Sequence, residues 1–180
     1  MKNKKNTVIE VATKLFAEQG FENTSVAKIC EVANVSKGLV YHHFKSKDEI
    51  LEEIFTSTTK KMMEMNKAVT RDSPKKQLTD LITAIFSQLQ DDKLFYQLNL
   101  NIMFQPSTKK LLSTHIKDRS SALLTHTKEI FNKIDPAQST KLSYIFIAEI
   151  DGVSLNYLSV FENYPLEELR DHLIYKYRNL

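Results

Sequence analysis

The stretch Ser36–Phe44, with the sequence SKGLVYHHF, decides how the N-terminal end of the chain folds. It is too short and too polar to be a core helix, yet Ser36 is a favoured helix-capping residue. Ser46 and Glu49 follow with the spacing of a capping box, which opens another helix. A short helix whose surface carries lysine, tyrosine and histidine side chains is suited to pressing into a partner.

Two further helices precede this stretch. Residues 4–18 carry one apolar stripe with helical spacing, and Gly20 follows where a left-handed residue can end the helix. A second helix begins after Thr24 and Ser25, either of which can cap it. It ends at Asn34, the non-glycine residue that best accepts left-handed geometry. Two short helices joined by such a turn have the spacing of a helix-turn-helix.

Composition points to an all-α chain. Among 180 residues there are only 3 glycines and 4 prolines, too few for the many turns of a β-rich fold. We expect about nine helices. No apolar run approaches the length of about 20 residues that spans a membrane, and the N-terminus does not resemble a signal peptide. The single cysteine, Cys30, excludes an internal disulfide, so we expect a cytoplasmic protein that binds no membrane.

Positive charge is concentrated in the N-terminal quarter. Residues 1–47 hold eight lysines against four glutamates, so they carry +4, while the whole chain carries only +3. This asymmetry indicates either a polyanionic partner for that quarter or a solvated lysine-rich end.

A helix-turn-helix places its second helix in the major groove of double-stranded DNA. We expect residues 37–43 to be that helix, with its first turn towards base edges and its last turn towards phosphates. Gly38 would allow close approach of the backbone. The candidate DNA-binding residues are Thr24, Ser25, Lys28, Ser36, Lys37, Gly38, Leu39, Tyr41, His42, His43 and Lys47.

Residues 4–60 resemble the DNA-binding domain of the TetR family of bacterial transcriptional regulators. The matching residues are Ala12-x-x-Leu15-Phe16, Gly20-Phe21, Thr24-Ser25-Val26, Ile29-Cys30 and Val35-Ser36-Lys37-Gly38-x-x-Tyr41-x-His43-Phe44-Lys45-Ser46-Lys47-Asp48-Glu49. The chain departs from the family pattern at Asn34, where the family usually has glycine, and at His42, where it often has tyrosine. The resemblance implies a homodimeric repressor that binds a palindromic operator and is released by a small, apolar effector.

The rest of the chain is predicted to be helical. A connecting helix covers about 46–66, a polar linker follows at 66–74, and five helical stretches come after it, one of them broken near Arg119. We therefore predict a helix-turn-helix domain over 1–48 and a ligand-binding and dimerisation domain over 67–180.

The stretch 142–161 is apolar on two sides, which predicts burial on two sides. Ala148-x-x-x-Gly152 gives it a flat strip for close helix contact. This helix and the last one could form a four-helix interface with a second copy, as family members do, or it could be the core helix of a monomer. The predicted interface residues are Ala148, Gly152, Leu155, Leu169 and Leu173.

In this family, aromatic and polar residues of the C-terminal part often line an effector cavity, although most are plain core. The candidates are Phe86, Tyr96, Met103, Phe104, His115, Tyr144 and Glu149. Glu149 could equally be an interface acid or lie at a rim. Adjacent His42 and His43 point about 100° apart, so we expect no metal and no cofactor. No catalytic motif is present, so we expect no enzyme; a DNA-binding regulator without a ligand is the alternative.

Overall fold

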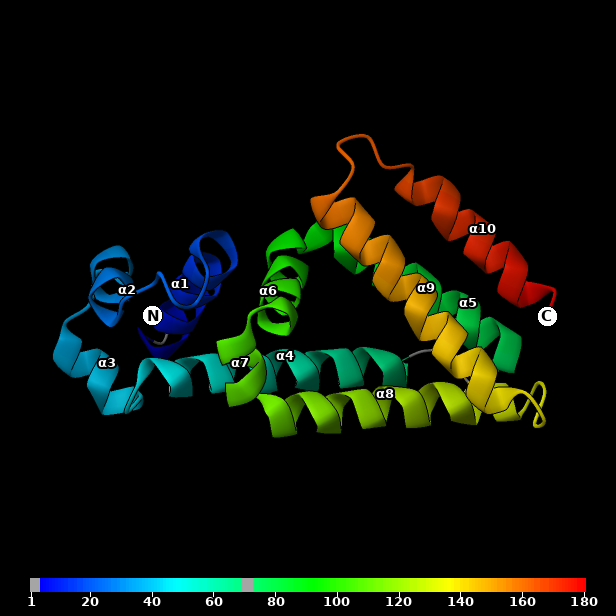
Figure 1. The fold of residues 1–180 in the computed structure, drawn as a ribbon, viewed down its shortest axis with the longest axis horizontal. Helices are drawn as coiled ribbons and strands as arrows, with labels where there is room; N and C mark the ends of the chain where they lie inside the picture. The colour runs from blue at the N-terminus through cyan, green and yellow to red at the C-terminus, as the bar shows by residue number, and fades with distance from the viewer. Residues whose placement is uncertain (1–3, 69–72) are drawn as a thin grey trace. The chain divides into compact units, whose positions relative to one another are not determined.

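The computed structural model describes residues 4–68 and 73–180, and these residues form ten helices and no strand (Figure 1). The helices are α1 (Lys4–Gln19), α2 (Val26–Ala33), α3 (Lys37–His43), α4 (Lys47–Ala68), α5 (Pro74–Asp91), α6 (Lys93–Phe104), α7 (Pro106–Leu111), α8 (Ser113–Asn132), α9 (Ser139–Ser159) and α10 (Leu166–Arg178). The prediction of an all-α chain is confirmed. Part of the predicted linker at 66–74 belongs to α4, and 69–72 lie outside the described residues.

The chain divides into two compact units. The first comprises Met1–Lys61 and Leu94–Ile116, and the second comprises Met62–Lys93 and Lys117–Leu180. The first unit thus contains α6 and α7 as well as the helix-turn-helix. The predicted division into a DNA-binding domain and a ligand-binding and dimerisation domain concerns function, and it stays a prediction.

The core of the first unit joins α1–α4 to α6 and α7. Leu98, Ile102 and Leu112 belong to the same buried cluster as Phe16 and Ile54. Burial of such side chains contributes roughly 1.5–3 kcal/mol each to the free energy of unfolding. A hydrogen bond also fixes the position of α6 along α1, because the Nδ2 of Asn101 donates to the Ala17 carbonyl oxygen at 2.9 Å. The helix-turn-helix is therefore packed on a segment that lies far along the chain.

One predicted helix is two helices in the structure. The stretch that begins near Ser107 was expected to break near Arg119, but the break lies at Leu112, between α7 and α8. Leu112 has non-helical backbone angles (φ −96°, ψ 15°) and is fully buried in the first unit. Packing of Leu112 thus moves the break seven residues from the predicted site and accounts for the tenth helix.

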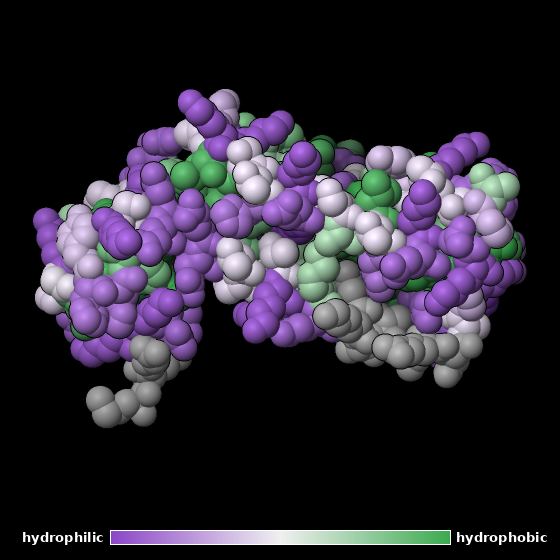
Figure 2. All heavy atoms as spheres, turned by 90° about the horizontal axis from the view of Figure 1, so that it is seen from below, coloured by the Kyte–Doolittle hydropathy of each residue, from purple (hydrophilic) through white to green (hydrophobic). Residues whose placement is uncertain are grey.

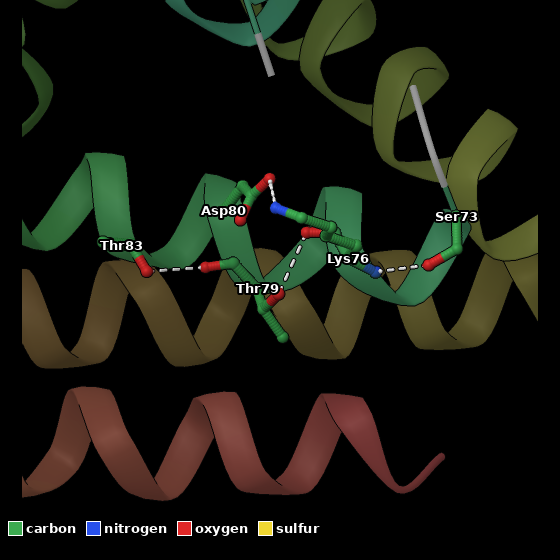
Figure 3. A network of polar contacts seen from close by, with 5 residues as sticks. All are labelled: Ser73, Lys76, Thr79, Asp80 and Thr83. Carbon is green, nitrogen blue, oxygen red and sulfur yellow. Dashed lines mark hydrogen bonds and ion pairs between the residues drawn. The ribbon is translucent and has the colours of Figure 1, made fainter. Parts of the chain in front are cut away.

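In the second unit, α5 begins with a set of local hydrogen bonds (Figure 3). Ser73 caps the helix by accepting from the Lys76 backbone N–H at 3.1 Å, and Pro74 occupies the first turn. Lys76 pairs with Asp80 one turn further on, at 2.7 Å. The first residues of α5 are therefore fixed by their own sequence.

An aromatic cluster holds α8, α9 and α10 together. The ring centroids of Phe131, Phe146 and Tyr177 lie 5.1–6.0 Å apart, and all three residues are buried. Such pairs prefer edge-to-face geometry and add about 0.5–1.5 kcal/mol each beyond their burial. Tyr177 also donates its hydroxyl to Glu149 at 2.8 Å, and Lys176 pairs with the same carboxylate. Burial and this carboxylate raise the pKa of Tyr177 above its usual value.

Only one side of α9 is buried within this chain. Phe146 and the small residues Ser143 and Ser154 face the interior, and each serine hydroxyl donates to the backbone carbonyl four residues earlier. The opposite side carries Tyr144 and Ile145, which are 59% and 37% exposed. The second apolar side that the sequence predicts is thus present but exposed within the described part of the second unit.

Hydrophilic side chains cover most of the molecular face shown in Figure 2, and apolar ones form separate patches. In the part of the chain that the structure describes, no helix combines the length and the apolar character needed to cross a bilayer.

Candidate nucleic-acid interface

Local interactions fix both helices of the helix-turn-helix. Ser25 caps α2 by accepting from the Lys28 backbone N–H at 3.1 Å, and Asn34 ends it in the left-handed conformation (φ 50°, ψ 52°). The N–H of Val35 then donates to the Cys30 carbonyl oxygen at 3.0 Å. The predicted cap and the predicted left-handed turn are both confirmed.

The second helix, α3, is seated by its apolar residues. Ser36 caps it by accepting from the Leu39 N–H at 3.2 Å. Val40 and Phe44 lie one turn apart, are 1% and 2% exposed, and belong to the core of the first unit. Burial on that side leaves the other side of α3 free to meet a partner.

The exposed face of α3 consists of Lys37, Gly38, Tyr41 and His42. These positions share one side of the helix because residues three and four apart are neighbours. Tyr41 is 54% exposed, and a Cβ added to Gly38 would meet no atom closer than 3.9 Å. Leu39 and His43 are only partly exposed, on the flank of the helix. We call this four-residue surface the reading face.

Five of the predicted DNA-binding side chains already make hydrogen bonds or ion pairs inside the protein. Lys28 pairs with Glu31 at 2.9 Å, and Lys47 donates to the Phe21 carbonyl oxygen at 2.7 Å. Thr24 is 1% exposed, and its hydroxyl donates to the carbonyl oxygens of Leu15 and Gly20. Ser25 and Ser36 are exposed caps. The structure gives Thr24 a packing role, because a buried hydroxyl that is already bonded cannot reach a phosphate.

The predicted dimer residues separate into two groups. Ala148 is exposed on the side of α9 that carries Tyr144, whereas Gly152 and Leu155 are partly buried there, and a Cβ built on Gly152 meets no atom within 4 Å. By contrast, Leu173 is only 7% exposed and Leu169 is partly buried, so both face the interior of their own unit. The exposed face of α10 carries Tyr175, which is 69% exposed.

The predicted effector residues do not gather at one place within either unit. In the first unit, Met103 and Phe104 are exposed and His115 lies against the Phe55 ring, 6.4 Å between centroids. Tyr96 is partly exposed, nearer the other end of α6. In the second unit, Phe86 is buried in the core, Tyr144 is on the surface and Glu149 is bonded to α10.

A charged pair between α8 and α9 was missed. Burial lowers the pKa of Arg119 to about 10, and Asp151 acts in the opposite direction. Burial likewise raises the pKa of Asp151, against the attraction of Arg119. In the sequence, Arg119 occupies a position of the apolar stripe of its helix. A charged residue at such a position indicates a side chain that faces inward, and this signal could have identified the pair.

Among the described residues, no three metal-ligating side chains come together.

Comparison with known proteins agrees with the geometry of α1–α4. Residues 8–54 match the model of the family described as bacterial regulatory proteins, tetR family. The chain is 29% identical over 164 residues to the uncharacterized HTH-type transcriptional regulator YuxN of Bacillus subtilis (strain 168), covering 88% of this chain and 55% of YuxN. It is also 29% identical over 90 residues to the HTH-type transcriptional repressor KstR2 of Mycolicibacterium smegmatis, covering 49% of this chain and 44% of KstR2. The chain thus spans about half the length of these curated relatives.

The likeness to a solved structure extends over nearly the whole chain. A transcriptional regulator (TerR/AcrR family) from Aquifex aeolicus VF5 superposes with a TM-score of 0.76 at 25% identity, covering 97% of each chain. The helix-turn-helix of α2 and α3, the family match over α1–α4 and this superposition lead to one conclusion. Residues 8–54 belong to the tetR family of bacterial regulatory proteins, and the fold of nearly the whole chain is that of a transcriptional regulator of the TerR/AcrR family.

Proposed function

We propose that the protein is a sequence-specific repressor of transcription, which binds a palindromic DNA operator as a homodimer and is released by a small, apolar effector. The observation that carries the DNA-binding part is the reading face on α3, whose side chains point away from a helix anchored by Val40 and Phe44. Lys37 stands in the first turn, where base edges are reached, and Tyr41 and His42 stand one turn on. The name of the relative KstR2, a transcriptional repressor, supports the same conclusion.

The homodimer part is supported by the exposed side of α9. Tyr144, Ile145, Ala148 and Gly152 form an apolar strip with small residues at its centre, which allows two helices to approach closely. Two copies of α3 would then enter successive major grooves about 34 Å apart.

The effector part rests on membership of the family. An effector would favour a state in which α4 holds the two reading faces at the wrong spacing. It can shift that equilibrium only through its different affinity for the two states. Operator affinity measured with and without the effector tests this step, and an unchanged affinity would contradict it.

Selection of duplexes from a random pool by the full chain tests the DNA-binding part. We expect an enriched palindrome with half-sites about 10 base pairs apart, one helical turn. Reading-face contacts should discriminate at those half-sites by about 1–3 kcal/mol per good base contact. A pool that stays random after repeated rounds would contradict sequence-specific binding.

Gly38→Ala should separate folding from DNA binding. No protein atom would obstruct the new methyl group. Because alanine is a better helix former than glycine, the free energy of unfolding should rise by about 0.5–1 kcal/mol. Affinity for the selected operator should nevertheless fall, because the methyl group would lie between the α3 backbone and the DNA. Thermal unfolding and fluorescence anisotropy measure the two effects. Gain of stability with unchanged affinity would show that α3 does not approach the bases at Gly38.

A further inference from the structure

An open groove borders the reading face. Its volume is about 500 Å³ and its lining residues are Lys4, Cys30, Glu31, Asn34, Val35, Ser36 and Leu39. It runs from the first residue of α1 across the turn to the first turn of α3. Every lining residue belongs to the first unit. A groove shared with α3 would lie against whatever α3 binds.

Some lysines near the groove have partners within the protein and others do not. Three lysines of the helix-turn-helix region are engaged by other protein groups: Lys5 by Glu53 at 3.0 Å, Lys28 by Glu31 at 2.9 Å, and Lys47 by the Phe21 carbonyl. Within the described part of the chain, the ammonium groups of Lys4 and Lys37 have no such contact. The pairing with Lys28 also offsets the charge of Glu31, the acidic residue in the lining. Lys4 is therefore the cation that the groove can offer to a ligand.

Geometry identifies the ligand. A major groove is about 12 Å wide and a helix with its side chains is 10–12 Å across, so α3 would nearly fill it. The walls of the major groove are the two sugar–phosphate backbones, and side chains on the flank of α3 must lie beside one of them. Leu39, which lines the groove in the protein, is on that flank. Ser36 and Lys4 are the kinds of residue that contact phosphates.

From these observations we infer that the groove receives a sugar–phosphate backbone of the bound duplex, and that Lys4 binds one of its phosphates. The inference rests on the proposed DNA-binding function and extends the contact surface beyond the helix-turn-helix to the start of α1. The contact is independent of base sequence, because a phosphate carries no sequence information.

Lys4→Ala tests the inference through the salt dependence of binding. The probe is a random-sequence duplex of about 30 base pairs, long enough for two heads one helical turn apart. Loss of one phosphate contact from each of the two heads should lower the slope of log Kd against log salt concentration by about 1.8. It should weaken binding about sixtyfold at 0.1 M salt and hardly at all near 1 M. Lys4→Arg should retain the wild-type slope, because the charge remains.

Lys14→Ala is the matched control. Lys14 lies on the same helix, its side chain is 61% exposed, and it pairs loosely with Glu18 at 3.9 Å without lining the groove. We expect its slope to equal that of the wild type. A wild-type slope in Lys4→Ala, or an equal fall in Lys14→Ala, would overturn the role of Lys4 while the proposed function stands. Absence of salt-dependent binding by the wild-type protein would instead overturn the proposed function and the inference with it.

Discussion

In the proposed homodimer, Ala148→Glu is expected to separate the two copies into monomers. Ala148 lies at the centre of the exposed side of α9, between Tyr144 and Gly152. In a two-fold interface a residue near the axis meets its own copy, so one substitution would bury two carboxylates, each one turn from Asp151. Each unpaired buried charge would destabilise the interface by several kcal/mol, more than the packing of two helices is expected to offset. Affinity for a palindromic duplex should fall by roughly 10²–10⁴-fold, because the second head would no longer be tethered.

Sedimentation velocity measures the first effect and fluorescence anisotropy the second. Ala122→Glu is the control, because Ala122 is also an exposed alanine, on α8 of the same unit. It should leave both the dimer and the affinity unchanged. A dimer that survives Ala148→Glu would place the interface elsewhere on the chain.

Phe131→Ala is expected to cause the largest loss of stability. Phe131 is fully buried, and its ring contacts the rings of Phe146 and Tyr177 with centroids 6.0 and 5.8 Å apart. Truncation removes contacts to α9 and α10 together and leaves a cavity, which typically costs about 3–5 kcal/mol. For a chain of this size that corresponds to a fall in Tm of roughly 6–20 °C.

Phe104→Ala deletes the same atoms from a side chain that is 69% exposed. Its effect on the free energy of unfolding should be within about 0.5 kcal/mol. Calorimetry of both variants gives the comparison. Similar melting temperatures for the two would show that the aromatic cluster does not hold the second unit together.

The helix-turn-helix could be predicted nearly residue by residue, because its boundaries depend on local chemistry. Ser25 and Ser36 cap their helices through their own side chains, and Asn34 makes the turn through its own backbone preference. Only Thr24 differed: its hydroxyl could have served as a cap or a contact, and hydrogen bonds to Leu15 and Gly20 decided otherwise.

Features that depend on distant segments were harder to predict. The break at Leu112 arises because that side chain is buried in a core shared with α1 and α4, and sequence periodicity along 107–132 does not contain that information. Leu169 and Leu173 looked suited to an interface because they are apolar, but α10 uses them to pack within its own unit. An apolar stripe predicts burial and does not identify the partner that provides it.

The buried position of Cys30 makes it a built-in reporter. It is the single cysteine of the chain and is 6% exposed on the inner side of α2. Cys30 also lines the groove beside α3, so its rate of modification by a labelling reagent reports access through that groove together with local opening of the helices. Bound DNA should slow that rate in proportion to the stability it adds. The single thiol thus offers a probe of DNA binding that needs no engineered residue.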